Sequence, residues 1–142
     1  MEGQFRFATA VEVRWRDLDA LGHVNNAVYM TYLEKARVDY LRELGLVTFA
    51  PGEIGLILAE VTCTYRAPIS LGEAVTVCVR VSELRRSSFI FEYRMEGEGG
   101  RLVATAHTVQ VCYDYQLGRS MPIPDHWRET IVEYEPGLQN RT

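Results

Sequence analysis

A dense group of polar side chains lies just ahead of a long segment with helical apolar periodicity. Asp17 and Asp19 are followed by His23 and by two amides, Asn25 and Asn26. A carboxylate can act as a nucleophile, or as the general base that activates water. The first backbone N–H groups of a helix have no intrahelical partner and can stabilise an oxyanion. These parts together suit the hydrolysis of an activated acyl group such as a thioester.

The same residues also fit a structural interpretation. An Asp-x-Asp pattern before a helix often forms a turn, and Asn25 and Asn26 are plausible N-cap residues. We expect Asp17 to be a structural acid that caps this turn or pairs with Arg16, Arg14 or Arg37. No third or fourth oxygen ligand lies at loop spacing, so no calcium, magnesium or other metal site is predicted.

A second group of polar residues, Arg85-Arg86-Ser87-Ser88, separates two segments that resemble strands. A turn of this kind is normally solvated. The alternative is a phosphate site, in which arginines supply bidentate donors and serine hydroxyls add to them. The sequence contains no glycine-rich nucleotide loop, no His-Glu-x-x-His motif and no Gly-x-Ser-x-Gly nucleophile elbow.

The elements around these groups can be read from their periodicity. Residues 27–44 contain no glycine or proline and carry an apolar stripe at steps of three and four, which predicts a helix that ends at Gly45. A shorter helix is expected over residues 127–134. Alternation of apolar and polar residues predicts strands, and these cover residues 6–15, 57–65, 74–82, 89–96 and 102–113.

This order of elements predicts an α+β fold. A helix of 18 residues is about 27 Å long, so we expect an antiparallel sheet of about five strands to wrap around it and bury its stripe. Residues 1–142 are expected to form a single domain, with residues 135–142 as a frayed tail. The free outer edge of such a sheet favours pairing of two subunits.

Composition limits partners and location. The net charge is −4, with a pI near 5.4, which argues against nucleic acid as a partner. No apolar run approaches the ~20 residues of a membrane span, and the first 15 residues contain no signal-peptide core. Three cysteines at unpaired spacing, Cys63, Cys78 and Cys112, are interpreted as reduced strand residues. We therefore expect a cytoplasmic protein without a membrane partner.

The stretch from Val13 to Leu44, with Arg-Asp-Leu-Asp-Ala-Leu-Gly-His-Val-Asn-Asn inside it, resembles the signature of hotdog-fold acyl-CoA thioesterases, and more narrowly the 4-hydroxybenzoyl-CoA thioesterase clade. The element order over about residues 5–115 and the segment Arg86-Ser87-Ser88-Phe89 also fit this family. The resemblance implies homodimers, commonly paired into homotetramers, with active sites at the dimer interface.

The resemblance also implies roles for single residues. Asp19 matches the catalytic carboxylate, and the backbone N–H of Asn26 matches the donor that polarises the thioester carbonyl; relatives carry histidine or an aromatic residue at this second position. The run His23-Val24-Asn25-Asn26 also resembles that of acyl-carrier-protein thioesterases. This resemblance implies that His23 and Asn25 orient water or Asp19. The turn formed by Arg85, Arg86, Ser87 and Ser88 matches the place where clade members hold the nucleotide phosphates of coenzyme A.

The function expected from these observations is hydrolysis of an acyl-CoA to the free acid and CoA. No cofactor is expected, because CoA enters as part of the substrate. The alternatives are a non-catalytic acyl or acyl-CoA binding module and an acyl-carrier-protein thioesterase; a hydratase has no support beyond Asp19 and His23. The acyl group is not predicted, since the aromatic residues near the helix fit a core or a pocket, namely Tyr29, Tyr32, Phe89 and Phe91.

Overall fold

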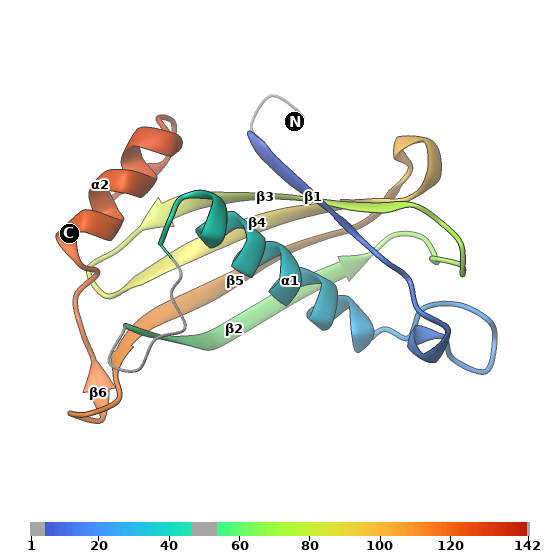
Figure 1. Ribbon diagram of the computed structural model, residues 1–142, viewed down its shortest axis with the longest axis horizontal. Coiled ribbons are helices and arrows are strands. Elements are labelled where there is room, and N and C mark those ends of the chain that lie inside the picture. The colour runs from blue at the N-terminus through green and yellow to red at the C-terminus, as the bar shows by residue number, and fades with distance from the viewer. Residues whose placement is uncertain (1–4, 47–53, 142) are drawn as a thin grey trace.

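The fold is a curled antiparallel sheet packed against one long helix, shown by a computed structural model that describes residues 5–46 and 54–141 (Figure 1). The main strands lie in the order β1-β3-β4-β5-β2, and all neighbours in this order are antiparallel. Their bounds are β1 (Phe7–Val11), β2 (Gly55–Tyr65), β3 (Val75–Leu84), β4 (Ser88–Glu96) and β5 (Leu102–Asp114). The predicted α+β class, with about five strands around a central helix, is confirmed.

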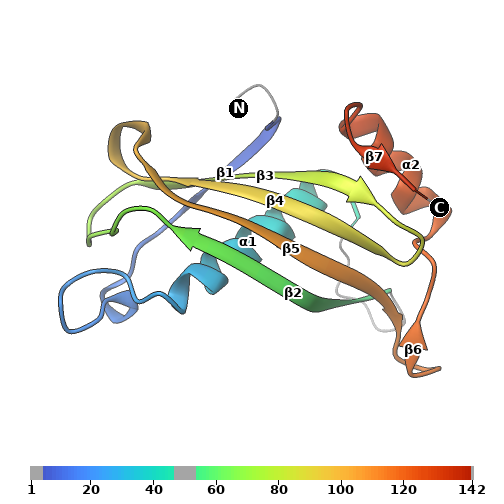
Figure 2. The same ribbon diagram turned by 180° about the vertical axis from the view of Figure 1, so that it is seen from behind.

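Two α-helices and two very short strands accompany these main strands in the described part of the chain. The central helix α1 (Val28–Glu43) crosses one face of the sheet, and α2 (Asp125–Tyr134) lies beside the end of β3 (Figures 1 and 2). The strands β6 (Arg119–Ser120) and β7 (Gln139–Asn140) pair with β5 and β3 respectively. No helix among the described residues combines the length and the apolar character needed to cross a membrane.

The apolar stripe of α1 explains why the sheet curls around it. The stripe is almost fully buried through Tyr29, Leu33, Ala36 and Tyr40. It packs on β3 and β4, whose buried residues alternate along each strand as a period of two requires. Each buried valine or phenylalanine of this face contributes about 1.5–3 kcal/mol relative to an exposed one. Both phenylalanines left open by the sequence, at positions 89 and 91, belong to this core.

The two ends of α1 are formed differently. Gly45 follows the helix with a φ of +73°, the left-handed conformation expected of a C′ glycine. The predicted N-caps are wrong, because Ala27 occupies the N-cap position and no side chain caps the helix. Asn25 instead accepts a hydrogen bond from Ala27 N–H through Oδ1, at 2.8 Å, one step before the helix begins.

The first strand is shorter than the predicted range of residues 6–15. β1 ends at Val11, and a 3-10 turn covers Trp15–Asp17. Trp15 is 78% exposed, although its alternation with Val13 indicated a buried strand residue. The cause is the carboxylate of Asp17, which accepts a hydrogen bond from the backbone N–H of Arg14 and turns the chain away from the sheet.

The C-terminal segment is bonded to the sheet, so the prediction of a frayed tail over residues 135–142 is wrong for the part that the structure describes. β7 pairs in parallel with the end of β3, and Arg141 N–H donates to Leu84 O at 2.7 Å. Glu135 is 5% exposed and accepts hydrogen bonds from Tyr40 OH and Val81 N–H. A buried carboxylate with two donors and a strand pairing together order this segment.

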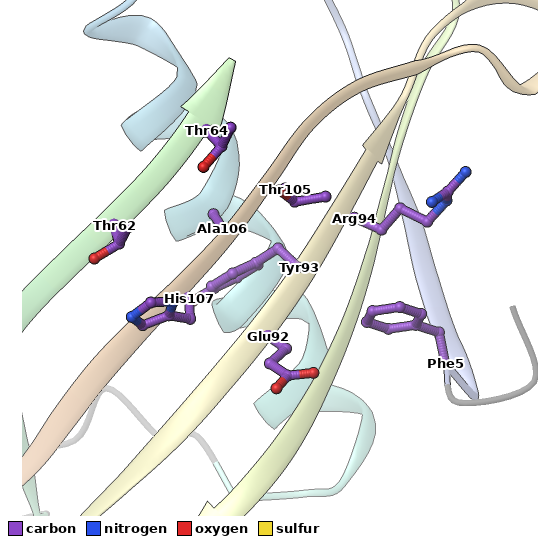
Figure 3. Close-up of a pocket in the computed structure, with 9 residues that line it drawn as sticks. All are labelled: Phe5, Thr62, Thr64, Glu92, Tyr93, Arg94, Thr105, Ala106 and His107. Carbon is purple, nitrogen blue, oxygen red and sulfur yellow. The ribbon is translucent and has the colours of Figure 1, made fainter. Parts of the chain in front are cut away.

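The two faces of the sheet differ in character. On the face turned away from α1, a polar hollow of about 370 Å³ is lined mainly by side chains of β2, β4 and β5, including Thr62, Glu92, Arg94 and His107 (Figure 3). On the face towards α1, the edge strand β2 presents apolar side chains that the helix leaves uncovered. Leu58, Val61 and Tyr65 are 44%, 38% and 42% exposed, and their partners on β5 are the buried residues Gln110, Thr108 and Ala104.

Candidate active site

The loop ahead of α1 is anchored by the first of its two acids. Asp17 is 2% exposed, and its carboxylate accepts hydrogen bonds from Tyr32 OH at 2.7 Å and from Arg14 N–H at 2.9 Å. The guanidinium group of Arg14 forms an ion pair with it at 3.2 Å. The backbone carbonyl of Asp17 accepts a hydrogen bond from Asn25 N–H, which joins the beginning of the loop to its end. The contacts agree with the structural role predicted for this acid.

Opposing effects act on the ionisation of Asp17. Burial by itself raises the pKa of the carboxyl group, but the hydrogen bonds from Arg14 N–H and Tyr32 OH, with the charge of the Arg14 guanidinium, outweigh burial. The net result is a pKa below its usual value. Asp17 is therefore an ionised anchor at neutral pH.

The second acid, Asp19, lies at the surface in an Asx-type turn. Its Oδ1 atom accepts hydrogen bonds from Leu21 N–H at 2.8 Å and from His23 N–H at 3.3 Å. Gly22, with a φ of +83°, allows the chain to reverse here. The other carboxylate oxygen, Oδ2, makes no hydrogen bond within the described part of the chain. One oxygen therefore fixes the orientation of Asp19 and the other stays available.

A hollow of about 300 Å³ lies beside Asp19. It brings together three of the residues predicted from the sequence, because Asp19, His23 and Asn26 all line it. Its remaining lining comes from apolar and aromatic groups, Val24, Tyr29, Tyr65, Ala67 and Pro68. Asn25 is not among the lining residues, since its side chain is bonded to the backbone of Ala27.

The backbone at the start of α1 is held in one orientation. Asn26 O accepts the hydroxyl of Tyr65 at 2.8 Å, and the next N–H, that of Ala27, donates to the Asn25 side chain. The peptide group between residues 26 and 27 is thus bonded at both of its ends. Asn26 N–H itself makes no hydrogen bond to another described residue. A free N–H at a helix start is a suitable donor for a developing oxyanion.

Two tyrosines form the aromatic wall of the hollow. Tyr29 and Tyr65 pack edge to face with 4.8 Å between ring centroids. Burial raises the pKa of both hydroxyl groups, with smaller contributions from neighbouring groups that include Cys63, so both remain protonated donors at neutral pH. The sequence analysis considered Tyr29 as core or pocket and missed Tyr65. The only signal for Tyr65 was its place as the last apolar residue of the alternating segment 57–65.

The Arg85–Ser88 turn connects β3 and β4, and this connection lies at the opposite end of the sheet from the loop ahead of α1 (Figure 1). Ser88 pairs with Val111 on β5, whereas Tyr65, beside the hollow, pairs with Ala104. Seven residues of β5 separate these two positions, which corresponds to about 23 Å along the strand at ~3.3 Å per residue. A single protomer therefore does not bring the two predicted groups together.

The turn itself is tight and basic. Arg85 N–H donates to Ser88 O at 2.8 Å, which closes the connection between β3 and β4. The Arg85 side chain is paired with Glu83 at 2.7 Å. The Arg86 side chain is exposed and makes no hydrogen bond or ion pair with any residue of ranges 5–46 and 54–141. Arg86 is thus the guanidinium group of this turn that is available to a ligand.

The structure offers no grouping of side chains suited to a metal ion in the ranges that it describes. These residues contain no cluster of three or more histidine, cysteine, aspartate or glutamate side chains in a metal-binding arrangement. The three cysteines form no disulfide in the same part of the chain.

Comparison with known proteins connects this geometry to a family. The model of the thioesterase-like superfamily matches residues 13–131. The long-chain acyl-CoA thioesterase FadM of Escherichia coli (strain K12) is 29% identical over 128 residues, which cover 88% of this chain and 96% of FadM. A second curated relative, the uncharacterized protein YsmA of Bacillus subtilis (strain 168), is 26% identical over 90% of this chain and 86% of its own length.

Solved structures are similar over almost the whole chain. A thioesterase of Thermus thermophilus, crystallised with coenzyme A and Zn, is 37% identical with a TM-score of 0.82 and covers 94% of this chain and 97% of its own. A thioesterase-superfamily structure from Jannaschia sp. CCS1 is 30% identical with a TM-score of 0.86, over 95% and 86% of the two chains. These similarities confirm the hotdog arrangement of sheet and helix. The chain belongs to the thioesterase-like superfamily.

Proposed function

We propose that the protein, a thioester hydrolase, hydrolyses an acyl-CoA to the free acid and CoA. The observation that carries this proposal is that Asp19, which keeps one unbonded carboxylate oxygen, and Asn26, whose N–H is unbonded within the described residues, line the same hollow. The names of similar proteins support the substrate class, because FadM is a long-chain acyl-CoA thioesterase and the Thermus thioesterase is complexed with coenzyme A.

In this mechanism the thioester carbonyl oxygen points at Asn26 N–H, which stabilises the negative charge that develops there. Asp19 Oδ2 either attacks the carbonyl carbon or takes a proton from the water that attacks it. Nucleophilic attack expels CoA thiolate and leaves an acyl-aspartyl anhydride, which water then hydrolyses. In the general-base route, water adds directly, the C–S bond breaks, and the thiolate leaves as CoA.

The predicted helpers, His23 and Asn25, act in this proposal through the backbone. His23 N–H holds Oδ1 of Asp19 and leaves Oδ2 unbonded. The Asn25 side chain holds Ala27 N–H and thereby fixes the peptide that follows Asn26. Both residues orient the reacting groups, which refines the role implied by the family resemblance.

We place the acyl group between α1 and the edge strand β2. The helix-facing side of β2 carries uncovered apolar side chains, Leu58, Val61 and Tyr65, beginning at the hollow and continuing along the strand. Burial of an acyl chain on this surface removes apolar area from water on both sides of the contact. Among the described strands only β5 pairs with β2, and a second subunit can cover the other edge of this strand.

A homodimer through β2 would complete the site, with the homotetramer as a further pairing of such dimers. Two β2 strands related by a two-fold axis run antiparallel. The Tyr65 end of one strand then faces the Gly55 end of the other. Gly55 pairs with Tyr113, and the neighbouring residue Cys112 donates its N–H to Ser87 O. The Arg85–Ser88 turn of the partner subunit therefore lies at the same end of the dimer as Asp19.

The partner's turn would bind the nucleotide phosphates of CoA. Arg86 supplies an unpaired guanidinium group, Arg85 supplies one that exchanges Glu83 for phosphate, and Ser87 and Ser88 add hydroxyl donors. This basic turn favours CoA over an acyl carrier protein as the thiol carrier. No cofactor takes part, and the cytoplasmic location stays a prediction.

The test is hydrolysis of acetyl-, octanoyl-, palmitoyl- and benzoyl-CoA, and the release of the free thiol measures the rate. Asp19→Asn keeps the shape of the side chain but removes the base and nucleophile, so we expect kcat to fall by at least ~10². Turnover by Asp19→Asn within a few-fold of the wild type would exclude Asp19 from the mechanism. Binding of acyl-CoA by the wild type without any thiol release would favour a binding module instead.

A further inference from the structure

Three successive carbonyl groups of the Arg85–Ser88 turn are bonded by three separate parts of the chain. Arg85 O accepts the Nη2 atom of Arg128 at 2.5 Å. Arg86 O accepts Ile123 N–H at 2.9 Å, and Ser87 O accepts Cys112 N–H at 2.8 Å. Because its carbonyl groups are bonded within the protein, the turn leaves its basic and hydroxyl side chains for a ligand. Only the first of these three bonds comes from a side chain.

Arg128 connects the turn to the C-terminal segment. Its Nη1 atom donates to Asn140 Oδ1 at 2.6 Å and to Arg141 O at 3.3 Å, while Nη2 reaches the turn. The half-buried guanidinium group therefore joins α2, β7 and the end of β3. Its hydrogen-bond acceptors are all uncharged oxygens, so its positive charge is not neutralised by them and adds to that of Arg86.

The same segment also controls the acid nearest the turn. Glu83 pairs with Arg85 at 2.7 Å and with Arg141 at 3.6 Å. Because Arg141 supplies a second cation to Glu83, Arg85 can leave this carboxylate for a phosphate without leaving it unpaired. The position of Arg141 depends in turn on the bond between its carbonyl and Arg128.

We propose that Arg128 is a positioning residue for the nucleotide end of CoA. It acts by fixing the Arg85 carbonyl and the C-terminal segment, so that the phosphate-binding side chains are ordered before the ligand arrives. Preorganisation of this kind lowers the entropy lost on binding. The inference rests on the proposed CoA site and adds a residue that contacts neither phosphate nor thioester.

The experiment compares two thioesters of the acyl group that the wild type hydrolyses best. One is the acyl-CoA, and the other is the acyl-pantetheine, which has the same reacting group but lacks the nucleotide. For Arg128→Gln we expect KM for acyl-CoA to rise about 3–10-fold, because the variant loses one or two hydrogen bonds. We expect kcat for both substrates and KM for acyl-pantetheine to stay unchanged.

Arg6→Gln is the matched control. Arg6 donates to Tyr134 O at 2.7 Å, so this variant also removes an arginine-to-carbonyl bond from α2, but at the end of the helix away from the turn. It should leave both KM values unchanged. If Arg128→Gln melts too early to be assayed, Arg128→Lys keeps the charge and one donor, and an intermediate rise in KM for acyl-CoA alone supports the role.

Two results would overturn the proposal, and only the second of them would also overturn the proposed CoA site. An equal rise of KM for acyl-CoA and acyl-pantetheine would show that Arg128 supports the fold in general. If the wild type and Arg86→Gln use the two thioesters equally well, the turn does not bind the nucleotide, and the proposed CoA site fails together with the role of Arg128. In the first case the loss of CoA preference in Arg86→Gln still supports the site.

Discussion

At each end of α1 a tyrosine of the helix is bonded to a buried carboxylate, but the pKa of the two carboxyl groups shifts in opposite directions. At the N-terminal end, Tyr32 donates its hydroxyl to buried Asp17, and at the C-terminal end Tyr40 donates to buried Glu135, both at 2.7 Å. Each carboxylate also accepts one backbone N–H, from Arg14 and from Val81 respectively. Each acid thereby connects the helix to another part of the chain, the loop just ahead of α1 in one case and the C-terminal segment in the other.

The difference lies in the balance between burial, which raises the pKa of both carboxyl groups, and the hydrogen bonds and charges that lower it. Arg14 contacts Asp17 directly, and the pKa of Asp17 is lowered in spite of burial. Burial dominates at Glu135, where its hydrogen bonds and the more distant charges of Arg80 and Arg6 do not compensate, and the pKa is raised. The hydrogen bonds to Asp17, together with the Arg14 guanidinium in contact, thus outweigh burial, whereas the two donors to Glu135 do not.

Asp17→Asn should give the largest effect on stability. An asparagine can keep the bonds from Tyr32 and the Arg14 backbone, but it loses the ion pair and turns its NH₂ group towards the guanidinium. We expect a loss of about 2 kcal/mol in the free energy of unfolding at pH 7, with kcat of the folded protein within a few-fold of the wild type. Chemical denaturation and thiol release measure the two quantities.

The pH dependence of this loss provides the control. Because the pKa of Asp17 is lower in the folded protein than the unfolded value of 3.8, its stabilisation is complete above that pH and is lost as the pH falls through the folded pKa. The difference between wild type and Asp17→Asn should therefore shrink in acid. A folded Asp17→Asn protein of normal stability without turnover would reverse the roles of the two acids.

Tyr65→Phe tests whether the N-terminal end is the catalytic end. The variant keeps the ring against Tyr29 but removes the donor to Asn26 O, so the peptide after the oxyanion donor is held only through Ala27 N–H. We expect kcat to fall about fivefold, corresponding to the ~1 kcal/mol of one hydrogen bond. Thiol release under saturating acyl-CoA measures it.

Tyr40→Phe is the counterpart at the other end of the helix. It removes the hydroxyl that donates to Glu135 and should lower stability while kcat is retained. Equal kcat values for Tyr65→Phe and the wild type would mean that the hydroxyl of Tyr65 does not position the site. Comparable kcat losses in both variants would show a general effect of loosening α1.

What the sequence could predict depends on the separation of the groups involved. Asp19, His23 and Asn26 lie in one short loop, so their spacing was enough to predict that they meet. Tyr65 reaches the same site across 39 positions, through the register of β2, and no local pattern carries that information. The fold class was predictable because its long strands and helix each repeat their own period over many residues.

Two of the errors in the predicted elements share one physical origin. Glu135 was expected in a frayed tail because a glutamate near a chain end is usually solvated, yet its partner Tyr40 lies 95 positions earlier. Trp15 was expected in a strand because it continues the alternation of Val13, yet the bond between Asp17 and Arg14 N–H ends the extended chain there. In both places a buried carboxylate overrides the local preference.

Glu135→Gln should give the smallest effect, with the opposite sign to Asp17→Asn. Below about pH 4.5, the unfolded value, Glu135 is protonated in both states, and a glutamine that accepts the same two donors should be equally stable. As the pH rises through the raised folded pKa, ionisation costs the wild type stability that the glutamine variant keeps. We expect Glu135→Gln to melt about 2–4 °C higher than the wild type at pH 7.5, and no higher at pH 4. If Glu135→Gln is less stable than the wild type at both pH 4 and pH 7.5, the hydrogen bonds to the carboxylate stabilise it more than burial destabilises it. The contrast between the two helix ends would then disappear.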